Sequence, residues 1–108
     1  MRMITVLAMG ALAAGGAVEA QSPPVQDPRM LLHKYKCDSC HARDEAKTGP
    51  ALVDVAARYR GDGKALDTLA TTIRGGAQGA GPWHMPPHPE VSAADARSMA
   101  RYILALKP

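Results

Sequence analysis

Large aromatic side chains are scarce in this sequence. It contains no phenylalanine, one tryptophan and three tyrosines in 108 residues. A chain of this length forms at most one domain, and with so few large side chains that domain can build only a thin core. The composition therefore indicates a small domain that draws part of its apolar surface from a bound group.

Cysteine is also rare, with one residue at position 37 and one at position 40. A zinc site built on this pair would need two further ligands at a matching spacing, and the chain has no other cysteine. A thioredoxin-like redox pair would lie within a strand–helix–strand pattern, which the sequence lacks. A metal-binding or thiol-redox module is therefore an alternative that the sequence does not favour.

Charge of one sign is not concentrated in any segment. The formal net charge is +3, which makes the chain mildly basic. A nucleic-acid surface would show a basic run with interleaved aromatic residues, and no such run exists. The sequence therefore predicts no nucleic-acid partner.

The two cysteines belong to the pentapeptide Cys37-Asp38-Ser39-Cys40-His41. A C-x-x-C-H motif is typical of c-type haem attachment. Thiols three positions apart can each add to one of two neighbouring vinyl groups of the porphyrin, and the next residue is then held beneath the iron. Imidazole binds iron there through one ring nitrogen. We predict that Cys37 and Cys40 form thioethers, which leaves no disulfide, and that His41 is an iron ligand.

The first residues have the features of a secretory signal peptide, predicted to span residues 1–20. A short apolar stretch rich in alanine and glycine follows Arg2, and Val18-Glu19-Ala20 is a weak cleavage site. An uncleaved membrane anchor is the alternative, but the stretch is short for a bilayer. Because c-type haem is attached outside the bacterial cytoplasm, the chain is expected to be periplasmic, without a membrane span after cleavage.

The rest of the chain divides into a leader and a helical domain. Residues 21–26 carry prolines and are expected to be a flexible leader, and residues 27–108 form the domain. Apolar residues at helical spacing predict four helices, and no segment has the pattern of a strand. The expected helices run from Asp27-Pro28 into Cys37, from Ala51 to Tyr59, from Lys64 to Ile73, and from Ser92 onward, with Met99 in the buried stripe of the last.

Between the last two helices lies a long segment, residues 75–89, that is dense in glycine and proline. Loops of this length in a small domain are usually functional or disordered. The segment contains Met85-Pro86-Pro87, and electron-transfer cytochromes use a thioether as the sixth ligand of haem iron. Met85 follows His41 at a distance that lets the chain return on the far side of the porphyrin. We therefore predict Met85 as the second iron ligand.

Other side chains were weighed for the same position. Met30 lies too near the motif on its own helix, and Met99 belongs to an amphipathic stripe. His84 and His88 are the rivals that remain, although a histidine in a loop is more often a surface residue than a ligand. His33 is expected at the surface.

The chain from Asp27 to Lys107 resembles the small class I cytochromes c of bacterial periplasms, single-haem carriers that feed nitrite reductases and terminal oxidases. The stretches that carry the resemblance are Cys37-Asp38-Ser39-Cys40-His41, Thr48-Gly49-Pro50-Ala51, Asp54-Val55-Ala56-Ala57-Arg58-Tyr59, Ile73-Arg74-Gly75-Gly76-Ala77-Gln78-Gly79 and Met85-Pro86-Pro87. The resemblance implies an all-α class I cytochrome c fold of about four helices wrapped round one covalently bound haem c. It also implies axial ligation by His41 and Met85, with the Pro50 carbonyl accepting the proton on the far nitrogen of the histidine.

Three departures from the family stand out. Lys36 precedes the first cysteine where the family often has glycine or alanine, and Leu32 stands where a phenylalanine is expected. Ala80 replaces a tryptophan before Gly81-Pro82, and Trp83 follows instead, so no role is assigned to Trp83. None of these changes touches the predicted haem ligands.

The predicted function is that of a periplasmic single-electron carrier, monomeric and not an enzyme, with a reductase, oxidase or dehydrogenase as its redox partner. With both axial positions filled, the iron has no site for a substrate. A haem subunit of a periplasmic dehydrogenase or other oxidoreductase complex is the alternative. A five-coordinate haem with peroxidase or gas-binding activity is a further one.

Overall fold

The computed structural model describes residues 3, 10, 26–78 and 84–108 of the chain. Nearly all of the predicted signal peptide and of the predicted leader, and Trp83, therefore lie outside the described residues. Helices make up most of what is described, in the order α1 (Pro28–Lys34), the short 3₁₀ helix η1 (Cys37–Ser39), α2 (Leu52–Arg58), α3 (Ala65–Gly75) and α4 (Ala93–Leu104). No helix in these ranges is long and apolar enough to cross a bilayer.

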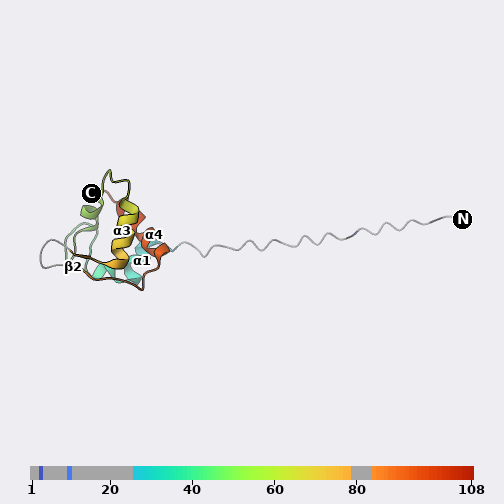
Figure 1. The fold of residues 1–108 in the computed structure, drawn as a ribbon, viewed down its shortest axis with the longest axis horizontal. Coiled ribbons are helices and arrows are strands. Elements are labelled where there is room, and N and C mark those ends of the chain that lie inside the picture. Colours follow the sequence, from blue (N-terminus) through green and yellow to red (C-terminus); the bar gives the residue numbers. More distant parts are fainter. Residues whose placement is uncertain (1–2, 4–9, 11–25, 79–83) are drawn as a thin grey trace.

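Helix α4 is the central packing element. It contacts α3 most extensively and also packs against α1 and α2 (Figure 1). The core between these helices includes Leu31, Met99 and Val91, each almost completely buried. The burial of Met99 confirms the prediction that this methionine belongs to the amphipathic stripe.

The expectation that no strand would form is wrong. Residues Ala77–Gln78 (β1) and His84–Met85 (β2) pair as antiparallel strands, with Ala77 opposite Met85. Each strand has only two residues, so neither is long enough to show the alternation of apolar and polar residues by which a strand is recognised in a sequence.

The first helix begins as predicted and ends earlier. The Asp27 carboxylate accepts the main-chain N–H of Arg29, and Pro28 occupies the first turn. The helix ends at Lys34, before the cysteine motif, and Lys36 then adopts a left-handed conformation with φ 61° and ψ 27°. This reversal separates α1 from η1 and turns the cysteine motif out of the helix.

A hydrogen bond joins the end of α1 to the start of α4. The Ser92 hydroxyl caps α4 by accepting the N–H of Asp95, as predicted. The Asp95 carboxylate accepts a hydrogen bond from the Tyr35 hydroxyl at 2.5 Å. This bond, together with partial burial, raises the pKa of Tyr35 above its ordinary value of 10.0. Tyr35, two residues before the cysteine motif, is thus tied to the central helix.

Lys36→Gly should stabilise the protein. A side chain in the left-handed region costs about 1–2 kcal/mol relative to glycine, and the greater freedom of glycine in the unfolded chain offsets part of that gain. We expect the free energy of unfolding in urea to rise by about 0.5–1 kcal/mol. Arg101→Gly, at an exposed site inside α4, should instead lower it by about 1 kcal/mol. Equal losses in both variants would contradict the expectation.

The contribution of the Tyr35 hydroxyl should depend on pH. Since the pKa of Tyr35 is raised in the folded state, unfolded chains lose the phenolic proton at a lower pH than folded ones. The stabilisation is therefore complete below about pH 10 and disappears as pH rises through the folded-state pKa. The difference in urea midpoint between wild type and Tyr35→Phe should shrink above that pH. The control is Tyr59→Phe, because the Tyr59 hydroxyl has no hydrogen bond within the described ranges. If the difference in urea midpoint between wild type and Tyr35→Phe stays constant with pH, the expectation is wrong.

Candidate haem-binding site

The turn η1 brings the two cysteines and His41 together. The Cys37 carbonyl accepts hydrogen bonds from the N–H groups of Cys40 and His41, at 3.1 and 3.0 Å. Both thiols are free and half-buried. Burial, followed by the negative charge of Asp38, raises the pKa of the Cys37 thiol. Two thiols and one imidazole are therefore presented by a single hydrogen-bonded turn.

The imidazole of His41 is fixed by the Pro50 carbonyl. Its Nδ1 lies 2.8 Å from the Pro50 oxygen. A carbonyl oxygen can only accept a hydrogen bond, so Nδ1 carries the proton and donates it. In the neutral ring Nε2 then holds the lone pair, which is the state required of a metal ligand.

Gly49 packs directly against the same ring. A Cβ atom at this position would lie 2.5 Å from Cε1 of His41 and 2.8 Å from its Nδ1. The Gly49 N–H also donates to the Cys40 carbonyl at 2.7 Å. Only a residue without a side chain fits there, so Gly49 is a site residue that the sequence analysis missed. Its one signal in the sequence is the stretch Thr48-Gly49-Pro50-Ala51, which is among those that carry the family resemblance.

Met85 lies on a different part of the chain. It is half-buried in β2, opposite Ala77 of β1. A few residues later the N–H of His88 donates to the Arg74 carbonyl in the last turn of α3, at 2.9 Å. The segment with Met85 is thus attached to the end of α3, whereas the cysteines and His41 are held by η1 and Pro50.

The histidines that compete with Met85 have other surroundings. His84 is exposed, and Nδ1 of His88 lies 3.2 Å from the Glu90 carboxylate. His33 is exposed, as predicted, and its Nδ1 lies 2.8 Å from Asp38. The hydrogen bond from His33 lowers the pKa of Asp38. Two of the three histidines therefore have carboxylate partners.

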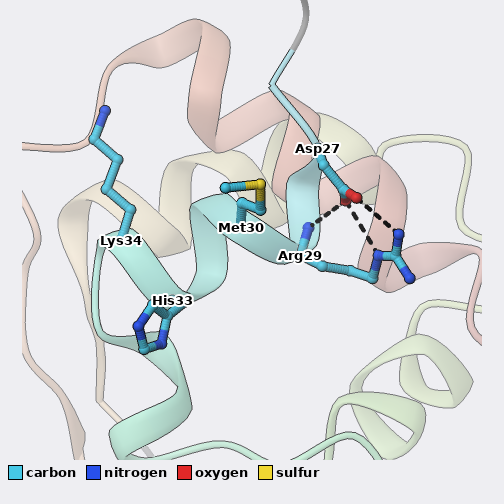
Figure 2. A pocket seen from close by; sticks show the side chains of 5 residues that line it. All are labelled: Asp27, Arg29, Met30, His33 and Lys34. Carbon is cyan, nitrogen blue, oxygen red and sulfur yellow. Dashed lines mark hydrogen bonds and ion pairs between the residues drawn. The ribbon is translucent and has the colours of Figure 1, made fainter.

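A shallow hollow lies on the outer side of α1 (Figure 2). The Arg29–Asp27 ion pair is at one side, Met30 lies in the middle and the Lys34 side chain extends away on the other side; His33 completes the lining. Met30 is 70% exposed. None of the predicted site residues lines this hollow, which separates it from the candidate site.

The residues at the candidate site fit a covalently attached haem. The two free thiols share one turn, and the His41 tautomer leaves Nε2 as the metal-binding nitrogen. The Cys37 side chain packs against the apolar core, so a porphyrin joined to it would begin in apolar surroundings. One imidazole and two thiols fall one short of the four protein ligands of a structural zinc site. Among the described residues, no group of three or more His, Cys, Asp or Glu side chains is arranged to hold a metal ion by itself.

Comparisons with known proteins match this chain to cytochromes. Residues 23–103 match the protein family described as "Cytochrome C oxidase, cbb3-type, subunit III". Cytochrome c-551 of Stutzerimonas stutzeri is 43% identical over 97 residues, which cover 89% of this chain and 92% of that protein. Cytochrome c-551 of Pseudomonas aeruginosa is 40% identical over 101 residues, with 93% and 96% covered.

A solved structure shows the same fold. The crystal structure of Nitrosomonas europaea cytochrome c552 aligns with a TM-score of 0.68 and 41% identity, over 73% of this chain and 99% of that one. The mostly helical architecture therefore confirms the predicted fold class. From the cysteine–histidine turn, the family match and these relatives, the chain belongs to the small class I c-type cytochromes, which are electron-transfer proteins and not enzymes.

Proposed function

We propose that this protein is a periplasmic single-electron carrier with one haem c, attached through Cys37 and Cys40 and ligated by His41 and Met85. The observation that carries the proposal is the hydrogen bond between His41 and Pro50. It selects the tautomer that binds a metal through Nε2, and His41 belongs to the same hydrogen-bonded turn as the two cysteines that would anchor a porphyrin. The bound group supplies reversible one-electron oxidation and reduction of iron.

The role of the chain is to hold a fixed set of donors. Pro50 accepts a hydrogen bond from the His41 ring and Gly49 packs against it, so these contacts would hold the ring in one orientation beside a bound haem. Met85 contributes a neutral thioether, which favours the reduced state and raises the potential. Two protein ligands leave no open position, which supports a carrier rather than a catalyst. The partners are redox proteins, because a carrier of this kind must receive and deliver electrons by contact.

A second candidate is a haem subunit of a larger oxidoreductase. The description of the matching family, which names an oxidase subunit, favours it. The c-551 relatives are matched along nearly their whole length, which supports the free carrier. Size-exclusion chromatography of the native periplasmic fraction separates the two: a free carrier elutes near the mass of the monomer, and a subunit elutes with a larger complex.

The direct test of the proposal is a visible spectrum of protein expressed in the periplasm, recorded oxidised and reduced. We expect the spectrum of a six-coordinate c-type haem that stays with the polypeptide after acid–acetone extraction. Extraction of the haem, or carbon monoxide binding without denaturant, would contradict covalent attachment or full ligation, respectively.

Met85→Ala should open the sixth position. The reduction potential should fall on the order of 100 mV, within the range that axial ligands span, and carbon monoxide should bind the reduced protein. The ferric charge-transfer band of sulfur ligation should disappear. Because His84 could replace the lost ligand, the double variant with His84→Ala is the cleaner test. Survival of the band in Met85→Ala would make the assignment of Met85 wrong.

Gly49→Ala should displace the His41 ring. The added methyl group would approach Cε1 to 2.5 Å, so the ring must move and its hydrogen bond to Pro50 weakens. We expect a loss of about 1–3 kcal/mol in the free energy of unfolding and a smaller yield of haem-loaded protein. Gly63→Ala is the matched control, since a Cβ there meets nothing within 4 Å. Equal behaviour of the two variants would show that Gly49 does not support the histidine.

A further inference from the structure

The backbone at Gly76 lies extremely close to the segment that contains Met85. A Cβ atom at Gly76 would be 2.6 Å from the Met85 oxygen, 2.9 Å from the Pro87 nitrogen and 3.0 Å from the Pro86 carbonyl carbon. All three are main-chain atoms, so they cannot rotate away as the end of a side chain can. Any larger residue at position 76 must therefore push the Met85 segment outward.

Gly76 also has a conformation that other residues rarely adopt. Its φ of 79° and ψ of 174° place it in a region occupied almost exclusively by glycine. The residue ends α3 and turns the chain into β1. Its shape thus makes possible both the turn and the close contact with Met85.

Further bonds on either side of Gly76 hold the same two segments together. Ala77 pairs with Met85 across β1 and β2. On the other side, the Arg74 carbonyl accepts the N–H of His88 at 2.9 Å, and the Arg74 Nε donates to the Val91 carbonyl at 3.0 Å. The contact at Gly76 lies between these attachments, where it sets the spacing of the two backbones.

We propose that Gly76 is a positioning residue for the sixth ligand: it fixes the backbone of Met85 before the sulfur binds iron. The inference rests on the proposed function, in which Met85 is that ligand. A backbone already in place loses little further freedom when its side chain coordinates, so the closed, six-coordinate form is favoured. A backbone displaced from this place has to be drawn back at each ligation, and the open form becomes more populated.

The test compares three variants of the haem-loaded protein. Gly76→Ala introduces both the unfavourable conformation and the collision with residues 85–87. Gly61→Ala introduces a side chain at a similar φ of 82° with nothing within 4 Å, and Gly75→Ala introduces one beside Gly76 with neither problem. The measurements are the ferric sulfur-to-iron charge-transfer band, the reduction potential and carbon monoxide binding to the reduced protein.

In Gly76→Ala we expect the open population to rise about tenfold or more, seen as a weaker band, a lower potential and tighter carbon monoxide binding. The two control variants should keep the wild-type band and potential, although Gly61→Ala should lose stability. If Gly76→Ala has the same band and potential as Gly61→Ala, the inference about Gly76 is wrong. Ligation by Met85 would still be supported by the band of the wild type. Absence of the band from the wild type would overturn the proposed ligation and the inference with it.

A second measurement does not depend on the folding of Gly76→Ala. Hydrogen exchange of the His88 amide, which is bonded to Arg74, reports whether the segment stays attached to α3. In Met85→Ala the amide should remain protected to within about threefold of the wild type, because the contact at Gly76 does not need the metal bond. Loss of protection in Met85→Ala would show that the bond between iron and the Met85 sulfur holds the segment against α3. That result would overturn the inference.

Discussion

The orientation of one imidazole ring is the constraint on which the rest of the site depends. A hydrogen bond to Pro50 and the backbone of Gly49 fix the ring of His41, and the hydrogen-bonded turn at Cys37 fixes its backbone. A ring with free rotation would have to be ordered by the metal itself, and its tautomer would be undefined. Here the protein defines both, so the geometry of the histidine does not rely on the metal.

Main-chain atoms do most of the positioning on both parts of the site. The His41 ring meets a carbonyl and a glycine, and the Met85 segment meets the glycine at position 76 through three of its own main-chain atoms. Such contacts are insensitive to the identity of neighbouring side chains. They also explain how a domain with no phenylalanine can hold two segments firmly: short backbone contacts replace part of the packing that large side chains would provide.

The sequence predicted the features that depend on residue type and spacing. The caps at Asp27 and Ser92, the buried Met99 and the four main helices follow from local patterns and are present in the structure. The two-residue strands and the early end of the first helix were missed, because so short a strand shows no alternation and a left-handed lysine has no sequence signature. The same holds for Gly49 and Gly76. Crowding against another segment leaves no periodic signal, and the stretches of family resemblance that contain both glycines do not show what the glycines contact.

The raised pKa of Cys37 has a consequence for the protein before it receives its cofactor. Thiol–disulfide exchange proceeds through the thiolate, and burial reduces the fraction of Cys37 in that form. In an oxidising compartment, a pair of cysteines three positions apart is exposed to closure into a disulfide, which would consume both attachment points. Burial lowers the share of Cys37 that is in the thiolate form able to enter that reaction. The packing against the apolar core that would surround a porphyrin therefore also keeps Cys37 in its less reactive, protonated form.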